Sequence, residues 1–528
     1  MRSGRGGEEG TATGLSRNQG LLWVLIAAVL LLGARIGDLP LLDPDEAKHA
    51  QVAREMLEAG RWLEPLVYGQ PYHHKPSFLY ALIGLCYRLV GVGELGARLV
   101  PAVAGLLTVC VVYRYASRQR VADGLLASLL LMASTLFFAV ARFTNFDGLL
   151  TLATFGAAVA VSRWIDSDGR DTRSVAWASA LAALGVLVKG PAAAVLLAVP
   201  ALLCGRAVLR NTPVRAYLVG AGCFAAIVGL WLIPALRLHP DYVRDFLWVH
   251  NVQRYSVDAD LFHPEPFWFF VPVLLVTLLP WSPMVPGALA AGWRRAGGER
   301  FLAAYALWVI VFFSLSNGKL ATYVLPAYPA LAVLAARWMN ETHPRARGVL
   351  SALAASIFLV SAPVAYVVLR LEEPGFEHLA WALLPTAAAG AWVLASRRGA
   401  LATDRGAIVA MSCALIGTYA VALVWFAPEV GRLTSDRDLA VAAAAGGPRP
   451  DAVVVHRVRP FSFLFYSRWP VVYKVTEAEY RAALTRPGRV LVLTKESRLD
   501  SLPATQPPVR LREIARNHRH VLYERLPF

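Results

Sequence analysis

The sequence predicts a polytopic α-helical membrane protein with a small soluble α/β domain at its C-terminal end, on the strength of three observations. Of the 528 residues, 57% are hydrophobic and the mean hydropathy is +0.49, whereas soluble domains are roughly 45–50% apolar. Apolar runs recur between Leu21 and Ala427, and each is long enough to cross about 30 Å of hydrocarbon as a helix. Arginines gather in short clusters between these runs.

The arginine clusters orient the predicted spans, because short cytoplasmic loops collect Lys and Arg. All of them are therefore expected on the inner side: Arg114/Arg118/Arg120, Arg163/Arg170/Arg173, Arg206/Arg210/Arg215, Arg294/Arg295/Arg300, Arg337/Arg345/Arg347 and Arg397/Arg398/Arg405. This constraint predicts about thirteen spans, near residues 20–37, 98–116, 121–140, 148–165, 174–189, 191–209, 216–236, 266–290, 301–316, 319–336, 349–370, 379–396 and 406–427. The net charge of +16 thus belongs to membrane loops and does not indicate a nucleic-acid partner.

The same threading divides the chain into three parts. Residues 1–19 are expected to form a disordered cytoplasmic tail, and residues 20–428 the transmembrane domain, which the motifs described below make the candidate catalytic domain. The first outer loop of that domain, residues 38–97, carries an amphipathic pattern over Glu46–Glu58 and an interfacial helix over Ser77–Val90. An odd number of spans places residues 429–528 outside, where β-like runs and one helical stretch predict a soluble α/β domain: Ala452–His456, Val490–Thr494 and His520–Tyr523, with the helix near Thr476–Thr485.

Acidic residues directly follow the first apolar run, in the segment Asp43-Pro44-Asp45-Glu46. One aspartate there is explained by a helix N-cap, but the segment holds more acid than one cap needs. Charges beside a membrane span are costly and mark functional sites. A carboxylate at this boundary can accept a proton from an acceptor hydroxyl or help to bind a divalent metal.

Lysines are rare in this chain, and most of them lie at the predicted outer face. Only six of the 52 basic residues are lysines, and four of these are at outer motifs: Lys48, Lys75, Lys189 and Lys319. A GC-rich genome that favours arginine, with lysines scattered by chance, is one explanation. The other is that a compact ammonium meets a phosphate or carboxylate as a point charge.

Further polar residues fall in the same outer segments. Tyr72 precedes adjacent histidines and Lys75, a run that suits metal or phosphate binding and also suits a polar turn ended by proline. Arg142 and Asp147 flank the second outer turn, where such a pair is often only structural. The remaining candidates are Arg254 as a bidentate phosphate clamp, His250 and His263 nearby, and Tyr323 after Lys319.

These residues favour chemistry at the outer membrane surface. The sequence contains no Walker loop, dinucleotide glycine motif or Ser-His-Asp arrangement. Nucleotide donors are absent from that compartment, so an enzyme there needs an activated donor anchored in lipid. The alternative is a transporter or flippase of an amphipathic anionic lipid-linked substrate, which predicts functional polar residues near the bilayer midplane. A scaffold with a degenerate site is a third hypothesis, and it predicts loss of the acids.

The chain resembles the membrane-embedded GT-C glycosyltransferases of the bacterial aminoarabinose-transferase and protein O-mannosyltransferase group. The resemblance spans roughly residues 40–335 and rests on these segments in family order: Asp45-Glu46-Ala47-Lys48, Ala53-Arg54-Glu55-Met56, Gly60-Arg61-Trp62, Tyr72-His73-His74-Lys75-Pro76, Ala97-Arg98-Leu99, Asp147, Lys189-Gly190-Pro191, Gln253-Arg254-Tyr255, Pro280-Trp281-Ser282 and Phe313–Pro326. It implies a GT-C fold and an inverting transfer of a hexose or pentose from a polyprenyl-phosphate donor.

The resemblance also implies roles for single residues. Asp45 is similar to the first-loop catalytic acid of the family and Asp147 to its second acidic position, with Glu46 beside them. The predicted donor phosphate-binding residues are Lys48, Lys75, Arg254, Lys319 and Tyr323. The predicted substrate-binding residues are Tyr72, Arg142 and Lys189.

Two positions depart from the family pattern. Lys48 stands where the family often has Arg, which keeps the charge but loses the bidentate fork. His74 stands where the family often has Glu, a position that binds a divalent metal in some members. His74 with His250 or His263 is therefore the predicted metal site, for zinc, magnesium or manganese.

The expected partners are a polyprenyl-phosphate sugar donor, an envelope acceptor and the bilayer, with no nucleic acid and a monomeric chain. The acceptor is a lipid A-like lipid, another glycan or a protein. The expected location is the bacterial cytoplasmic membrane, with the active site facing the periplasm.

Overall fold

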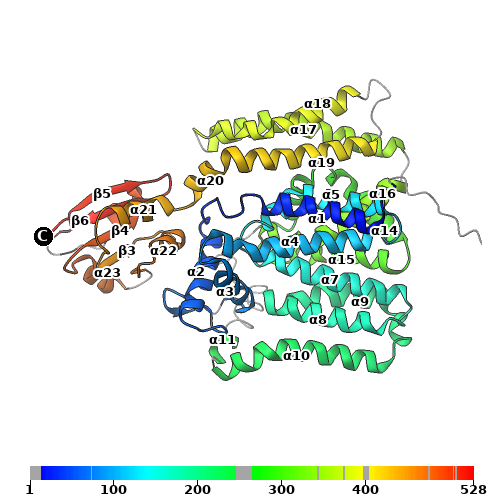
Figure 1. Ribbon diagram of the computed structural model, residues 1–528, viewed down its shortest axis with the longest axis horizontal. Coiled ribbons are helices and arrows are strands. Elements are labelled where there is room, and N and C mark those ends of the chain that lie inside the picture. The colour runs from blue at the N-terminus through cyan, green and yellow to red at the C-terminus, as the bar shows by residue number, and fades with distance from the viewer. Residues whose placement is uncertain are drawn as a thin grey trace, which may run out of the picture.

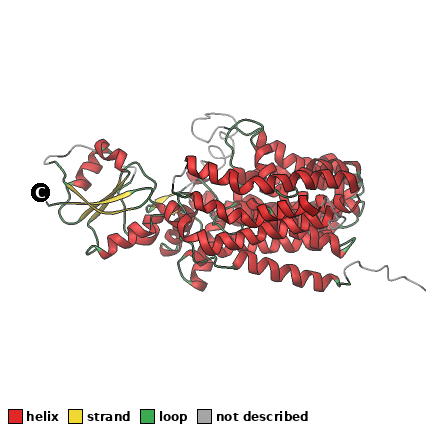
Figure 2. Cartoon of the chain, turned by 90° about the horizontal axis from the view of Figure 1, so that it is seen from above, coloured by secondary structure: helices red, strands yellow, loops and turns green. Residues whose placement is uncertain are grey.

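The computed structural model is an elongated helical bundle with a small sheet-containing domain beyond one end (Figures 1 and 2). It describes residues 14–72, 74–238, 240–244, 265–341, 344–372, 375–396, 404–473, 476–502, 505 and 508–527. The bundle helices run roughly parallel or antiparallel to its long axis (Figure 1). Helices are the expected form for these apolar runs because backbone groups find no partners in lipid.

Among the described residues, seven helical segments are long and apolar enough to cross a membrane: Glu94–Ala116, Asp147–Asp166, Val214–Leu238, Gly297–Ser314, Gly348–Leu371, Glu377–Ser396 and Arg405–Thr434. The first four are α4, α7, α10 and α15. The last three fall in α17 (Pro344–Glu372), in η6 (Glu377–Leu383) with α18 (Leu384–Ser396), and in α19 (Asp404–Val421), the π-turn η7 (Ala422–Phe426) and α20 (Ala427–Thr434).

The other bundle helices are shorter or interrupted, except α8, which has 18 residues but is not among these seven. They are α1 (Arg17–Gly33), α5 (Val121–Ala133), α6 (Thr135–Val140), α8 (Thr172–Lys189), α9 (Ala192–Gly205), η1 (Val208–Arg210), α11 (Pro240–Arg244), α13 (Phe270–Thr277), η4 (Ser282–Met284), α14 (Val285–Arg294), η5 (Ala321–Ala327) and α16 (Tyr328–Glu341). The predicted spans near 121–140, 266–290 and 319–336 are therefore broken helices. The count of thirteen spans is not confirmed, because hydropathy registers apolar length and does not register interruptions.

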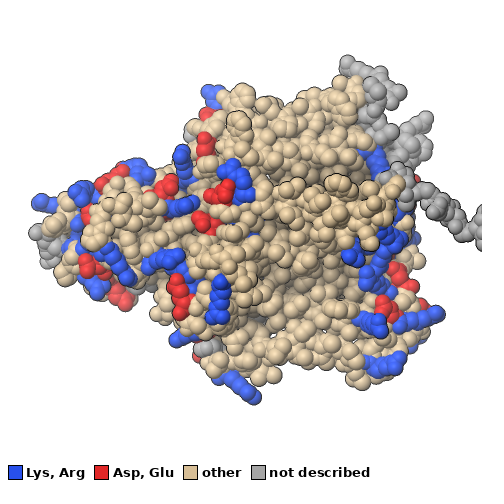
Figure 3. All heavy atoms as spheres, viewed as in Figure 1, with Lys and Arg blue, Asp and Glu red and all other residues tan. Residues whose placement is uncertain are grey.

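Charged side chains lie toward the ends of the molecule and not along the middle of the bundle. On the face seen in Figure 3, Lys, Arg, Asp and Glu gather at the far end of the bundle and around the C-terminal domain, with a broad uncharged band between them. Such a band is the surface expected of a protein that crosses hydrocarbon.

The first outer loop folds into two helices between the bundle and the C-terminal domain (Figure 1). These are α2 (Asp45–Glu58) and α3 (Phe78–Val90), joined through the short antiparallel pair β1 (Leu66–Val67) and β2 (Gln70–Pro71). Both helices predicted in this loop are confirmed. A hydrophobic cluster that includes Ala47, Ala50, Leu79, Tyr80 and Ile83 packs them together.

The C-terminal region contains a four-stranded mixed sheet in the order β3-β4-β6-β5. Its elements are α21 (Arg437–Ala445), β3 (Ala452–Val455), α22 (Phe461–Ser467), α23 (Glu477–Leu484), β4 (Val490–Thr494), η8 (Glu496–Ser501), β5 (Leu511–Arg516) and β6 (Val521–Arg525). β3 and β4 are parallel, and β6 pairs antiparallel with both β4 and β5. The three predicted strands and the predicted helix are present, whereas α21, α22 and β5 were not predicted.

Candidate active site

A cavity of about 510 Å³ opens beside the first turn of α2. Its walls come from α2, from the segment around Tyr72–Lys75, from the turn between α6 and α7, from the end of α8 and from η5. The charged lining residues are Asp45, Glu46, Lys48, Lys75, Asp147 and Lys189. Apolar residues complete the wall: Leu136 and Val140 of α6, and Leu320 just before η5. The cavity therefore offers charge and apolar surface together, as an amphiphile requires.

Asp45 begins α2 but does not cap it. The N-cap position is Pro44, and no side chain caps the helix, so the interpretation of Asp45 as an N-cap is wrong. Instead the Asp45 carboxylate accepts a hydrogen bond from Lys48 Nζ at 2.6 Å, and its side chain is 65% exposed at the cavity mouth. Partial burial opposes ionisation, but the nearby ammonium of Lys48 outweighs it and keeps the pKa of Asp45 below its usual value. The carboxylate is thus ionised at neutral pH.

A second acid–lysine pair lies deeper in the cavity. Asp147 is the first residue of α7 and Lys189 the last residue of α8, and their side chains form a short ion pair. Lys189 Nζ also lies 4.2 Å from the centroid of the Tyr323 ring, a cation–π geometry. Three segments distant in sequence are therefore brought together around one ammonium group.

Glu46 holds the site together and is not free to act as a base. Its two carboxylate oxygens accept from Arg98 Nε at 2.7 Å and Arg98 Nη2 at 2.8 Å. They also accept from the backbone N–H groups of Leu42 at 2.9 Å and Thr144 at 3.1 Å. The predicted catalytic role of Glu46 is corrected to a structural one, because its lone pairs are engaged and the pair is buried. This bridge joins α2, α4 and the turn before Asp147.

Arg142 and Lys319 also turn out to serve the fold. The Arg142 guanidinium donates to the carbonyl oxygens of Leu31, Leu32 and Ala34 at the end of α1, at 2.6–2.9 Å. Lys319 Nζ donates to the carbonyl oxygen of Glu265 at 2.6 Å. Neither residue lines the cavity, so their predicted substrate and phosphate roles are not supported by the geometry.

The remaining predicted residues divide between the cavity and undescribed segments. Tyr72, His74 and Lys75 line the cavity, and the rings of Tyr72 and His74 stack with centroids 4.6 Å apart. Arg254, His250 and His263 lie outside the described residues. In the part of the chain that the structure describes, no group of three His, Cys, Asp or Glu residues is placed to hold a metal. The metal site stays a prediction that rests on His74.

His49 is a cavity residue that sequence reasoning did not select as a site. Its Nδ1 lies 3.1 Å from Tyr80 Oη, and burial, reinforced by Lys48, lowers its pKa to about 3. The imidazole is therefore neutral and unsuited to pairing with a phosphate. The only available signal was its position one residue after Lys48 on the same helix.

The arrangement suits displacement of an anionic leaving group. Three ammonium groups, from Lys48, Lys75 and Lys189, face one cavity and can stabilise charge that develops on a phosphate. An ionised carboxylate stands at the mouth. The apolar walls are suited to contact with a lipid tail.

Comparison with known proteins gives a consistent result. Residues 74–232 match the family model described as dolichyl-phosphate-mannose-protein mannosyltransferase. A Pseudomonas aeruginosa PAO1 protein named undecaprenyl phosphate-alpha-4-amino-4-deoxy-L-arabinose arabinosyl transferase is 31% identical over 403 residues, which are 72% of this chain and 71% of the relative. A Sodalis glossinidius protein with the same name, numbered 1, is 32% identical over 376 residues, which are 68% of this chain and 66% of the relative.

The fold has a counterpart among solved structures. The crystal structure of ArnT from Cupriavidus metallidurans bound to undecaprenyl phosphate aligns with a TM-score of 0.80 at 21% sequence identity. The alignment covers 96% of this chain and 97% of that chain, so the likeness extends over the bundle and the C-terminal domain alike.

Proposed function

The chain belongs to the family of undecaprenyl phosphate-aminoarabinose arabinosyl transferases, and from that premise we propose that it transfers 4-amino-4-deoxy-L-arabinose from undecaprenyl phosphate to an envelope acceptor. It is a GT-C membrane glycosyltransferase that uses a polyprenyl-phosphate sugar. The resemblance seen in the first-loop motifs is confirmed. The observation that carries the proposal is the cavity in which two aspartate–lysine pairs and Lys75 face an apolar wall.

In the proposed reaction an acceptor oxygen attacks the anomeric carbon of the donor sugar. The bond between that carbon and the phosphate oxygen breaks, with inversion, and undecaprenyl phosphate leaves with the bonding electrons. Asp45 orients the acceptor and takes its proton. Lys75 and Lys189 stabilise the growing charge on the phosphate, with Lys48 holding Asp45 in place. Neither a nucleotide nor another energy source is needed, because the donor is already activated.

Donor specificity is assigned from the names of the relatives, and the acceptor is left as an envelope molecule: a lipid A-like lipid, another glycan or a protein. We place the active site on the periplasmic side of the cytoplasmic membrane, because the cavity lies at the end of the bundle that carries the C-terminal domain (Figure 1) and opposite the loops after α4 and α7, each of which carries an arginine cluster. The transporter hypothesis receives no support from the comparisons, in which the matched relatives are transferases.

The test uses the purified full-length chain in detergent–lipid micelles with a panel of radiolabelled undecaprenyl-phosphate sugars and crude envelope as acceptor. We expect release of undecaprenyl phosphate from the aminoarabinose donor, and a loss of about 10²–10⁴-fold in Asp45→Asn, the range for removing an acid–base group. Asp38→Asn is the matched control, because Asp38 is an exposed acid of the same loop that pairs with Arg35 at 2.7 Å. Release from no donor would overturn the enzyme class, and release from another donor alone would overturn the sugar.

A further inference from the structure

The C-terminal domain contacts the helix that carries Asp45 at three places along its length. Ser462 meets Asp43 just before α2, Phe461 lies under Lys48 Nζ with a centroid distance of 5.9 Å, and the carbonyl oxygen of Phe465 accepts from Arg54 Nη1 at 2.7 Å. Phe461 and Phe465 are one turn apart on α22. Both are part of the hydrophobic cluster of the first loop, so this face of α22 packs against the active-site loop.

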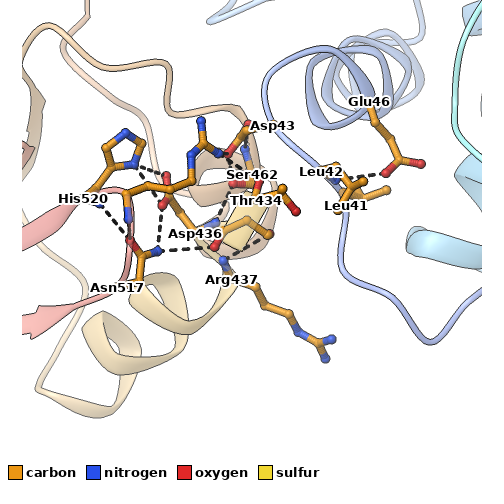
Figure 4. A network of polar contacts seen from close by, with 12 residues as sticks. Leu41, Leu42, Asp43, Glu46, Thr434, Asp436, Arg437, Ser462, Asn517 and His520 are labelled. Carbon is orange, nitrogen blue, oxygen red and sulfur yellow. Dashed lines mark hydrogen bonds and ion pairs between the residues drawn. The ribbon is translucent and has the colours of Figure 1, made fainter. Parts of the chain in front are cut away.

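Asp43 is the most tightly held of these contact points (Figure 4). Its side chain is fully buried, and its carboxylate accepts from the Ser462 N–H at 2.9 Å and from the Ser462 hydroxyl. Arg519 approaches the same carboxylate at 3.4 Å. The Asp43 N–H donates to the carbonyl oxygen of Thr434 at 2.9 Å. All of these partners belong to the chain after residue 430, and none to the first loop.

A second layer fixes Ser462 in turn. The Ser462 hydroxyl accepts from the Asp436 N–H at 2.9 Å while it donates to Asp43. The Asp436 carboxylate accepts from Asn517 Nδ2 at 2.9 Å and lies 2.8 Å from His520 Nδ1. Figure 4 shows these residues on the side of Ser462 that faces away from Leu42 and Glu46. A buried network in which each member has partners is rigid.

The Asp45 side chain, by contrast, is held by few contacts. Asp45 stands two residues after Asp43, its side chain is largely exposed, and the hydrogen bond recorded for its carboxylate comes from Lys48, which itself rests on Phe461. The first turn of α2 is held from two sides: Glu46 accepts from Arg98 and from the Thr144 N–H, and Asp43, just before the helix, is held by the C-terminal domain. Because no side chain caps α2, the N-terminal side of Asp45 depends on the contacts of Asp43.

We propose that Asp43 and Ser462 are positioning residues for Asp45, so that docking of the C-terminal domain places the reacting carboxylate at the cavity mouth. The proposal rests on the role of Asp45 in the proposed function. We call the contact between Asp43 and Ser462 the clamp. A misplacement of about 1 Å can cost an enzyme on the order of 10²-fold in rate, so loosening the clamp lowers turnover while the lysines that bind the donor stay in place.

The test compares Ser462→Ala, Asp45→Asn and the double variant in the full-length chain. Ser462→Ala is expected to lower kcat about 10–10²-fold, with the KM for the donor and the affinity for undecaprenyl phosphate within about twofold. In the Asp45→Asn background the same change is expected to add nothing, because residues that act as a unit are not additive. Arg437→Gln is the matched control, since it breaks another contact of the same interface, the 3.6 Å pair with Glu94, and should leave kcat unchanged.

Arg519→Gln is the second variant if Ser462→Ala does not fold, because Arg519 contacts Asp43 from a more exposed position. It should give the same pattern in weaker form. The proposal is overturned if kcat is unchanged in the clamp variant, if the loss persists in the Asp45→Asn background, or if donor affinity falls with kcat. If Asp45→Asn itself keeps wild-type kcat, the proposed function of Asp45 fails instead, and the two failures are thereby distinguished.

Discussion

The two ends of the bundle use buried ion pairs in different ways. At the end remote from the C-terminal domain, called the inner end after the orientation proposed above, Glu299 is held by both Arg295 and Arg337, and the neighbouring Gly298 N–H donates to Asp166 at 2.7 Å. At the opposite end, called the outer end, Glu46 and Arg98 form a more deeply buried pair. There the pair stands beside acids and lysines that face a cavity of about 510 Å³.

The difference shows that the outer end contains two kinds of charge with separate duties. Glu46 and Arg98 brace three segments, whereas Asp45, Asp147 and the cavity lysines face the space where a substrate fits. Of the pairs described above, those at the inner end only brace the fold. Removing a brace should cost stability at either end, and removing a cavity charge should cost activity.

The largest expected effect is on stability. Arg98→Met leaves Glu46 buried without its partner, which costs about 3–5 kcal/mol for such pairs. Arg337→Met should cost less, because Glu299 keeps Arg295. Chemical denaturation in mixed micelles measures both free energies of unfolding. Activity per folded molecule should fall in Arg98→Met alone, since only Arg98 borders the catalytic loop; an equal fall in Arg337→Met would remove the distinction between the two ends.

The next effect is on activity. Lys189→Gln removes one ammonium from the phosphate side of the cavity, and we expect kcat/KM to fall about 10²–10³-fold, as when one donor to a developing anion is lost. Steady-state kinetics with the undecaprenyl-phosphate donor measures this fall. Lys495→Gln, at an exposed lysine of the C-terminal domain, is the control. Normal turnover in Lys189→Gln would show that the pair of Lys189 and Asp147 only stabilises the fold, as Glu46 and Arg98 do.

Sequence separation explains how far the site could be predicted. Helices α2 and α3 follow from local patterns, and Asp45 with Lys48 lies within one turn of a helix. The pair of Asp147 and Lys189 joins positions 42 residues apart, and that of Glu46 and Arg98 joins positions 52 apart. Such pairs depend on how helices pack, which a single sequence does not reveal. Glu46 was therefore predicted to be catalytic, and its buried partner was missed.

The same reason hides the C-terminal contribution to the site. Ser462 and Asp43 are 419 residues apart, and although Asp43 lies in the acidic segment singled out above, nothing in the sequence pairs it with Ser462. The short helix α22 was missed because it has only seven residues and is apolar on two sides. Phe461 and Phe465 pack on the first loop, and Phe463 packs on the sheet. The predicted strands were found because each is a local run of β-branched and aliphatic residues.

A smaller effect is expected at the predicted metal site of the outer end. If His74 binds a divalent metal, a chelator should inactivate the wild-type enzyme, and added zinc, magnesium or manganese should restore it. His74→Ala should then require at least roughly tenfold more metal for half-maximal activity. Metal titration of the chelated protein gives this value, with His518→Ala as a control in the C-terminal domain. Full activity in the presence of chelator would show that the enzyme needs no metal at this site.

The smallest effect concerns pH and the clamp between the outer end and the C-terminal domain. Burial, together with the neighbouring Asp436, raises the pKa of Asp43 to about 8, against the opposing effects of Ser462 and Arg519. Between pH 4 and pH 8 the folded chain therefore holds a proton at this cluster that the unfolded chain releases. This bound proton stabilises the folded chain. Its contribution to the free energy of unfolding is fully present below the pKa of Asp43 in the unfolded chain and is lost as the pH rises through the pKa of Asp43 in the folded chain. His520 and Tyr68 also lie near this cluster, and both remain in Asp43→Asn, so the variant isolates the contribution of Asp43.

Denaturation midpoints of the wild type should fall between pH 5 and pH 8.5 by more than those of Asp43→Asn. Parallel curves would show that the Asp43 carboxylate is ionised throughout and that the clamp is insensitive to pH.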